Sequence, residues 1–308
     1  MAFALSTSWN AFRHDDAKKL IFEIKSLGFK DVELSFNLTA EMVSGIRQLV
    51  DSGEIRVLSL HNFCPIPDGL KREEALPDCY SLASLDEAQR QLSIKYTKRT
   101  IDTASSLNAT AVVLHTGRVE IADKTRWLIE YYQQGLKRPS AEFKQLKTKI
   151  IEERNRYIKP HFENILKSLD EIVPYACKRD ISLGIETRFY YREIPTFEEI
   201  SVILDIFKDS NIFYWHDTGH AQLMEDLGFI EHKKFLDAYG SRMLGIHLHD
   251  IIKASDHQPP GIGEIDFTFL KPYLNSRTIK IMEVHHPADA EAIRQAKAFL
   301  EKICDGKS

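Results

Sequence analysis

The sequence lacks the features that mark several large classes of protein. No segment approaches the roughly 18 consecutive apolar residues that a membrane-spanning helix requires. The first ten residues have neither a basic start nor an apolar run of signal-peptide length. The four cysteines, Cys64, Cys79, Cys177 and Cys304, form no C-x-x-C pair, which argues against a zinc knuckle or a disulfide framework. We therefore expect a cytoplasmic protein with reduced thiols and no membrane partner.

An excess of positive charge is also absent. The chain has 41 basic and 45 acidic residues, and its formal net charge is -4. Proteins whose main surface binds nucleic acid usually carry a basic excess, because phosphate contacts are made by lysine and arginine. The charge therefore argues against a nucleic-acid partner. A local basic group occurs within residues 116–160, at Lys137, Arg138, Lys144, Lys147 and Lys149.

Short apolar runs rich in β-branched residues alternate with longer segments of helical period. Eight runs are predicted strands: Phe3–Ser8, Val32–Ser35, Arg56–His61, Ala111–His115, Ile181–Glu186, Ile212–Asp217, Met243–His249 and Ile279–Val284. Eightfold alternation implies a parallel sheet, which closes into a (β/α)8 TIM barrel of typically about 250 residues. We predict one such domain over residues 1–308. An open doubly wound sheet is the alternative, but no glycine-rich phosphate turn follows an early strand.

The intervening segments predict helices and two long additions. Helices are expected over Asp15–Leu27, after Thr39, over 85–107, after Thr196 and over Asp289–Ile303. Ala141–Arg179 predicts two helices split near Pro160, since proline interrupts helical hydrogen bonding. Residues 62–84, rich in proline, are expected to form a long loop over the barrel mouth, and 116–160 an inserted loop and helix.

Carboxylates and imidazoles lie at the ends of successive predicted strands. Glu186, Asp217, His247 and Glu283 are spaced by about one β/α unit. The carboxyl ends of barrel strands meet at one face, where barrel active sites lie, so the four side chains should converge. This donor set suits a divalent cation such as Mn, Zn, Co or Fe. Each residue alone could equally be a paired core residue, and their recurrence at strand ends is what favours a site.

Several motifs resemble those of the xylose isomerase-like barrel superfamily, which includes sugar isomerases and epimerases, inosose dehydratase and endonuclease IV enzymes that cut abasic DNA. They are LGIET at 183–187, WHDTGH at 215–220, GIHLHD at 245–250, GIGEIDF at 261–267 and IMEV at 281–284. The resemblance to the epimerases implies one metal held by Glu186, Asp217, His247 and Glu283, with His220 contacting a sugar or polyol substrate. Glu186 and Glu283, on opposite sides of the cluster in chain order, are the expected proton-transfer pair.

Other reactions within the superfamily remain open. The same chemistry with loss of a hydroxyl gives a dehydratase, and a metal-binding barrel without catalysis is a third possibility. The endonuclease pattern would hold three zinc ions with His61, His115, Glu186, Asp217, His220, His247, His257 and Glu283. An aspartate expected two residues before His257 is Ser255, and we expect the adjacent Asp256 to point elsewhere. The lysine motif of true xylose isomerases is absent from residues 187–192.

The remaining candidates flank this set. Arg188 or Arg192 is expected either to bind substrate or to form a structural ion pair. Candidate pocket walls, with a core role as the alternative, are Trp9, Phe63, Tyr190 and Trp215. Histidines expected to support the ligands from behind are His249, His285 and His286. Histidines expected on helix surfaces are His14, His161 and His232. An oligomer is compatible with the sequence.

Overall fold

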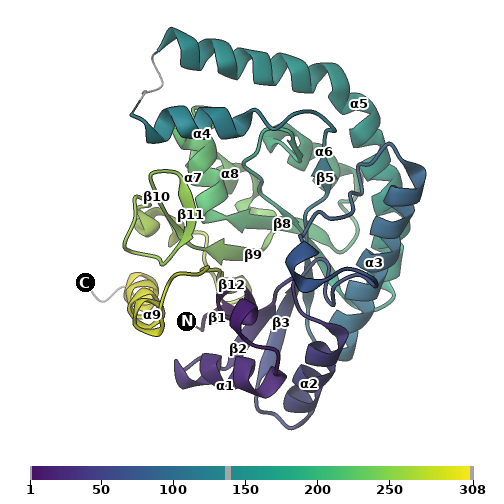
Figure 1. Ribbon diagram of the computed structural model, residues 1–308, viewed down its shortest axis with the longest axis vertical. Helices are drawn as coiled ribbons and strands as arrows, with labels where there is room; N and C mark the ends of the chain where they lie inside the picture. The colour runs from purple at the N-terminus through teal and green to yellow at the C-terminus, as the bar shows by residue number, and fades with distance from the viewer. Residues whose placement is uncertain (1, 136–139, 306–308) are drawn as a thin grey trace.

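The structure, a computed structural model, describes residues 2–135 and 140–305. Eight parallel strands form a closed barrel in the order β1-β12-β9-β8-β6-β4-β3-β2, seen near the centre of Figure 1. They are β1 (Ala4–Ser6), β2 (Asp31–Leu34), β3 (Arg56–His61), β4 (Ala111–Leu114), β6 (Ser182–Glu186), β8 (Ile212–Asp217), β9 (Met243–Leu248) and β12 (Ile279–Met282). The predicted (β/α)8 TIM barrel is confirmed.

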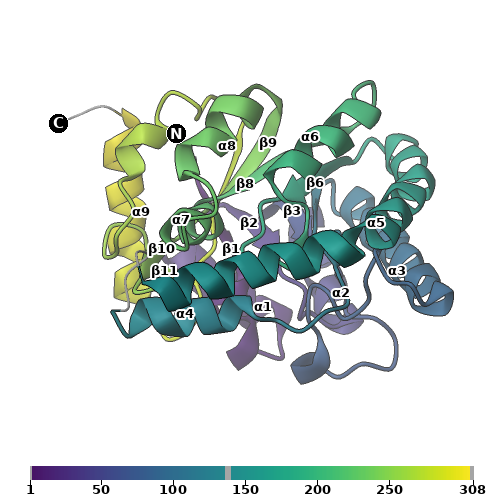
Figure 2. The same cartoon turned by 90° about the horizontal axis from the view of Figure 1, so that it is seen from above.

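Helices surround the barrel (Figures 1 and 2). They are α1 (Ala17–Ser26), α2 (Ala40–Asp51), α3 (Glu87–Ser106), α4 (Thr125–Gln133), α5 (Ala141–Cys177), α6 (Phe197–Ile206), α7 (Thr218–Asp226), α8 (His232–Tyr239) and α9 (Ala290–Asp305). The predicted helix starts at Thr39 and Thr196 are confirmed. Thr39 accepts a hydrogen bond from the Met42 amide, and Thr196 forms a capping box with Glu199.

The first strand is shorter than predicted. It ends at Ser6 because Ser6 caps a 3-10 helix, η1 (Thr7–Trp9), by accepting a hydrogen bond from the Ser8 amide. A second 3-10 helix, η2 (Ala11–Arg13), follows directly. The chain therefore leaves the barrel two residues earlier than the apolar pattern indicates.

The predicted split of α5 at Pro160 is wrong. A single 37-residue helix runs through both Pro160 and Pro174. Proline deprives the carbonyl four residues earlier of its donor. For Pro160 that residue is Arg156, and both are exposed, so solvent can satisfy the carbonyl. The first part of α5 packs beside α4 through a small apolar cluster that includes Leu128, Phe143 and Ile150, as Figure 2 shows.

The two long additions lie as short elements joined by loops. Residues 62–84 contain only a 3-10 helix, η3 (Arg72–Glu74), and residues 116–160 contain β5 (Gly117–Arg118), α4 and the start of α5. β5 pairs with β7 (Glu193–Ile194). In the basic group of this addition, Lys137 and Arg138 lie outside the described residues. Over the described ranges, no helix is long and apolar enough to cross a membrane.

Trp215 fills the barrel interior beneath the site. It is fully buried beside Ala111 and Ile281. Gly184 and Gly245, on the strands either side of it, leave it room: a Cβ would lie 2.7 Å from the ring at Gly184 and 2.3 Å from it at Gly245. Trp215 does not line the pocket, and the alternative of a core role is confirmed for it.

Two of the three histidines expected on helix surfaces are buried. His161 on α5 lies against the carbonyl of Ala83 at 2.9 Å and accepts from the Glu120 amide, because both long additions fold over this helix. His232 on α8 lies against the barrel, 2.9 Å from His216 on β8. His14 is half-buried beside Glu23. The position of a histidine on a predicted helix does not reveal which other segments of the chain pack over it.

Burial of His232 predicts an acid-sensitive contribution to stability. Burial lowers the pKa of His232 to about 3, whereas an unfolded histidine titrates near 6.5. The neutral ring therefore contributes its full stability above pH 6.5, and loses it as pH falls toward 3. Between pH 8 and pH 5, we expect the free energy of unfolding of the parent to fall by about 2 kcal/mol more than that of the variant His232→Gln. Urea titrations at the two pH values measure this, and parallel losses in both proteins would refute it.

Candidate active site

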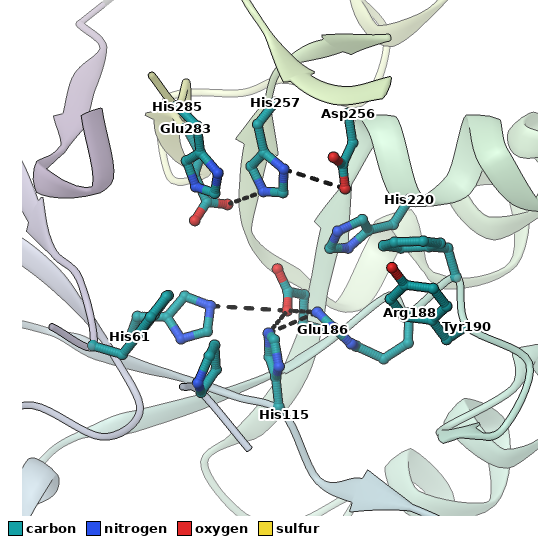
Figure 3. Close-up of a pocket in the computed structure, with 13 residues that line it drawn as sticks. His61, His115, Glu186, Arg188, Tyr190, His220, Asp256, His257, Glu283 and His285 are labelled. Atoms are coloured by element: carbon teal, nitrogen blue, oxygen red, sulfur yellow. Dashed lines mark hydrogen bonds and ion pairs between the residues drawn. The ribbon is translucent and has the colours of Figure 1, made fainter. Parts of the chain in front are cut away.

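A pocket of about 280 Å³ opens at the carboxyl ends of the barrel strands. Most candidate residues line it, as Figure 3 shows: His61, His115, Glu186, Arg188, Tyr190, His220, His257, Glu283 and His285. Glu283 and His257 lie on one side of the pocket, and Glu186 and His115 lie on the other. The strand-end pattern thus brings together residues separated by more than 200 positions in the chain.

Four buried side chains form a compact cluster at the base of this pocket. Glu186, Asp217, His247 and Glu283 each offer one ligand atom, and these atoms lie within 4.8 Å of one another. Parallel register places them, since Asp217 on β8 pairs with His247 on β9. His247 Nδ1 lies 2.8 Å from Glu186 Oε1, 2.9 Å from Glu283 Oε2 and 3.7 Å from Asp217 Oδ2. The imidazole nitrogen is the point on which all three carboxylates converge.

This convergence controls the charges of the cluster. Burial lowers the pKa of His247, but Glu283 and Glu33 outweigh burial, and the pKa ends well above its usual value. Burial raises the pKa of Glu283, but His247 and His257 outweigh it and hold that pKa well below its usual value. The pKa of Glu186 is likewise low, because His115 and Arg188 outweigh burial. The carboxyls are therefore ionised around a protonated imidazole.

Glu33 is a buried residue that the sequence analysis missed. It lies on β2, and its Oε1 and Oε2 are each 3.1 Å from His247 Nε2, on the far side of the ring from the other carboxylates. Ser59 on β3 donates to Glu33 Oε2 at 2.8 Å. The signal for this residue in the sequence was a glutamate inside an otherwise apolar predicted strand. Its contact with His247 depends on closure of the barrel, which brings β2 opposite β9.

The donor chemistry of the cluster fits a divalent cation. A metal-binding histidine usually donates its other ring N–H to a carboxylate, which fixes the ring. Here Nε2–H of His247 can donate to Glu33, while Nδ1 is directed at Glu186, Asp217 and Glu283 and would lose its proton when a cation binds. Several ionised carboxylates buried together repel one another, and a cation would relieve that repulsion. Mn, Zn, Co or Fe suits this mixture of oxygen and nitrogen donors.

Arg188 lies beside a second group of possible ligands. His61, His115 and Glu186 also bring ligand atoms within 4.8 Å of one another. Arg188 Nη1, however, lies 2.6 Å from His115 Nε2 and 2.7 Å from Glu186 Oε2. Its Nη2 donates to Glu193 at 2.9 Å. Arg188 is thus both a pocket residue and an ion-pair partner, and it places a fixed positive charge next to this group.

Arg192, the other arginine candidate, is directed away from the pocket. It donates to the carbonyl of Ile121 and lies 3.7 Å from Asp123. Its contacts hold the 116–124 segment against the loop after β6.

His220 projects into the pocket from the first turn of α7. Its Nδ1 lies 2.9 Å from the carbonyl oxygen of Thr187. A carbonyl can only accept, so Nδ1 carries the proton and Nε2 is an acceptor. Burial lowers the pKa of His220 to about 4, so the ring is neutral near pH 7. His220 can therefore accept a hydrogen bond from a hydroxyl.

Asp256 lines the pocket, contrary to the expectation that it points elsewhere. Its Oδ2 lies 3.3 Å from His257 Nδ1, and His257 Nε2 lies 3.8 Å from Glu283 Oε2. Burial lowers the pKa of His257, but Asp256 and Glu283 raise it to about 9. Asp256 and His257 lie on β11 (Ser255–Gln258), which pairs with β10 (Asp250–Ile252). The turn between these strands turns Asp256 inward, and sequence register alone did not reveal it.

His249 lies behind Asp217, as expected for a supporting residue. Its Nε2 lies 2.8 Å from Asp217 Oδ1, and its Nδ1 accepts from the His257 amide at 2.9 Å. The His249, His257 and His285 rings stack in turn, with centroids 4.2 and 3.7 Å apart. His286 is exposed and lies outside this pocket.

Asp250, the last residue of the GIHLHD motif, connects that motif to GIGEIDF at 261–267. Its carboxylate accepts hydrogen bonds from the amides of Ile251, Gly261, Gly263 and Ile265, at 2.9 to 3.0 Å. A Cβ on Gly263 would lie 2.4 Å from Asp250 Oδ1. Gly261 has φ +94, which favours glycine. The two motifs therefore form one loop beside the pocket.

The aromatic walls were only partly predicted. Tyr190 lines the pocket, but Trp9 and Phe63 are buried away from it. The walls that the sequence analysis missed are Phe36 and Phe189. Pro77 also lines the pocket, so the 62–84 loop reaches the barrel mouth, where its role as a lid stays a prediction.

Comparison with known families agrees with this geometry. The family described as xylose isomerase-like TIM barrel matches residues 21–303. The chain belongs to this family. Comparison with curated protein sequences found no significant match.

Solved structures of similar fold include several sugar epimerases. One is 3-keto-D-glucoside 4-epimerase, YcjR, from E. coli, with 14% identity, TM-score 0.69 and coverage of 98% of this chain and 99% of that chain. Another is L-ribulose 3-epimerase, with 14% identity, TM-score 0.68 and coverage of 99% and 95%. A third is D-psicose 3-epimerase from Clostridium cellulolyticum H10, solved with D-tagatose, with 13% identity, TM-score 0.66 and coverage of 99% of both. At these identities the similarity shows the fold.

The position of Glu33 predicts an effect on metal affinity. In Glu33→Gln, His247 loses the carboxylate that fixes its ring, and we expect Mn²⁺ affinity to fall about 10- to 100-fold. Equilibrium dialysis against Mn²⁺ measures this. Glu54→Gln, at a surface glutamate paired with Lys25, is the control and should bind as the parent does. Unchanged affinity in Glu33→Gln would exclude the supporting role.

Proposed function

We propose that this protein is a metal-dependent sugar isomerase or epimerase that moves a proton next to a carbonyl. The observation that carries the proposal is the pair Glu186 and Glu283. Both line the pocket from different sides, and both belong to the four-residue cluster. Proton removal on one face of a carbon and return on the other needs two carboxyl groups placed in this way.

The cation would be held by Glu186, Asp217, His247 and Glu283. A divalent ion there would polarise a substrate carbonyl and so acidify the adjacent C–H group. Arg188 favours a site for one ion. Its guanidinium lies next to His115 and Glu186, and its positive charge would repel a second cation at these residues.

The two glutamates are suited to proton transfer. Both have pKa values held well below the usual range, so each is ionised near pH 7 and able to accept a proton. One carboxylate removes the proton from the carbon, and the other takes up a proton from solvent and returns it to the opposite face. Release of the first proton to solvent then restores both carboxylates. Loss of a neighbouring hydroxyl instead of proton return would give a dehydratase.

Other pocket residues would bind and orient a polyol. His220 Nε2 is an acceptor for a hydroxyl, and protonated His257, between Asp256 and Glu283, is a donor. Phe36, Phe189 and Tyr190 supply apolar faces. Mixed hydrogen-bonding groups and aromatic walls are typical of sites for small polar ligands. The similar epimerase solved with D-tagatose supports a sugar as substrate.

The second candidate is a phosphodiesterase acting on abasic DNA. It is favoured by the group His220, His249 and His257, whose ligand atoms lie within 4.8 Å of one another. The overall charge of -4 argues against binding of a phosphodiester backbone, as do the acidic residues of the 62–84 loop, Asp68, Glu73, Glu74 and Asp78. Incision of an abasic duplex at low salt, lost in Glu283→Gln, would establish this function instead.

Exchange of a carbon-bound hydrogen tests the preferred function directly. We expect the Mn²⁺-loaded protein, incubated with D-tagatose or D-fructose in D₂O, to introduce one deuterium beside the carbonyl, as observed by NMR. Glu186→Gln and Glu283→Gln should each lower the rate at least about 10³-fold, because each lacks one carboxylate. Glu54→Gln is the matched control on the surface. Exchange that persists in both pocket variants would contradict the assigned roles.

The number of bound ions tests the part assigned to Arg188. We expect the parent to bind one Mn²⁺ per chain, and Arg188→Ala to bind a second weakly, because His61, His115 and Glu186 lose the competing cation. Metal analysis after dialysis gives the count. Arg192→Ala is the control, since this arginine follows the same strand but contacts Asp123. Two or more tightly bound ions in the parent would refute the assignment.

A further inference from the structure

A second cavity adjoins the candidate catalytic pocket. It has a volume of about 310 Å³. Phe36 and His285 line both cavities, so these two residues form a shared wall. Pockets for small ligands are usually about 300 to 1,000 Å³. The first cavity, at about 280 Å³, lies just below that range and the second at its lower end, whereas the two together lie well within it.

One side of the second cavity carries neutral hydrogen-bonding groups. Ser8, Ser35 and Asn37 line it. Ser35 donates to Asn37 Oδ1 at 2.7 Å, which leaves the Asn37 amide N–H groups as donors. Ser8 Oγ and His285 Nε2 are both buried and have no hydrogen-bond partner in the described structure. Buried polar atoms are rarely left unpaired, so these two atoms would pair with ordered water or, after a small side-chain shift, with a ligand in the cavity.

Aromatic rings form another part of the lining. Phe12 and His286 line the cavity and contact each other edge to face, with ring centroids 4.8 Å apart. Phe12 is 51% exposed, so a ligand in the cavity can reach its ring. Aromatic rings together with hydroxyl and amide groups match a sugar ring, which has an apolar C–H face and a polar rim.

Charge distinguishes the two cavities. The first is lined by Glu186, Glu283, Asp256 and Arg188. The second has no aspartate, glutamate, lysine or arginine among the described residues that line it. A phosphate group is usually bound by arginine, lysine or a helix N-terminus. The second cavity is therefore suited to a neutral group and not to the phosphate of a sugar phosphate.

We propose that the second cavity binds a neutral second sugar unit linked to the sugar that reacts in the first. The substrate class is then a keto-sugar that carries a glycosidic substituent. This inference rests on the proposed function for the chemistry of the first cavity. The second cavity itself supplies affinity and selectivity, through the polar groups of Asn37 and Ser8 and the ring of Phe12.

Binding measurements on matched ligands test the proposal without requiring turnover. The probes are D-fructose, the disaccharide lactulose, in which fructose carries a galactosyl unit, and D-fructose 6-phosphate. Calorimetric titration of the Mn²⁺-loaded protein should show lactulose binding at least about tenfold more tightly than either other probe. Equal affinities for the disaccharide and D-fructose, or no binding of the disaccharide, would overturn the proposal, as would tightest binding of the phosphate.

Variants test whether the tighter binding of lactulose arises in the second cavity. Phe12→Ala and Asn37→Ala should each weaken lactulose binding about five- to tenfold and leave D-fructose binding unchanged. Phe22→Ala removes another exposed phenylalanine, on α1 and outside both cavities, and should change neither. Equal losses for both ligands in the cavity variants would show that these residues act on the first cavity or on folding, and would overturn the assignment.

The experiment separates this inference from the proposed function. Selective disaccharide binding without deuterium exchange would leave the second cavity as a sugar subsite and refute the proton-transfer chemistry. Deuterium exchange into D-fructose without preference for the disaccharide would support the chemistry and refute the subsite.

Discussion

The site is organised by the repulsion among carboxylates buried around one imidazole. Glu186, Asp217 and Glu283 face His247 Nδ1, and Glu33 faces Nε2. Removing a carboxylate from water is costly unless a positive charge accompanies it. In this structure the proton on His247 supplies part of that charge. A divalent cation would supply more, and the arrangement of the donors is what such an ion requires.

The barrel lowers the free-energy cost of this arrangement, because its strands fix the backbone beneath each donor. Asp217 and His247 are partners in register, and Trp215 fills the interior below them against Gly184 and Gly245. The Asp250 carboxylate organises the following loop through four backbone amides. The pocket residues are therefore held by the core and by backbone hydrogen bonds, and the donors need little reorganisation to bind a ligand.

The histidine-rich motifs bring together more than one group of possible metal ligands, and neighbouring side chains distinguish these groups. His61, His115 and Glu186 are close enough to share an ion, but Arg188 places its guanidinium against two of them. Arg188 is held in turn by Glu193, whose strand β7 pairs with β5 in the 116–160 addition. A segment outside the barrel thus helps to position a charged side chain inside the pocket.

The sequence by itself determined which strand carries each candidate metal ligand, and it predicted both the barrel and the four-residue cluster. It could do so because the carboxyl ends of parallel strands meet at one face, so regular spacing along the chain becomes proximity in space. Only the tertiary structure decided the remainder. The contact of Glu33 with His247 needs ring closure, Asp256 needs the β10–β11 turn, and burial of His161 and His232 depends on what packs over them. The second cavity joins residues from both ends of the chain, and no local pattern encodes such a meeting because packing between distant segments creates it.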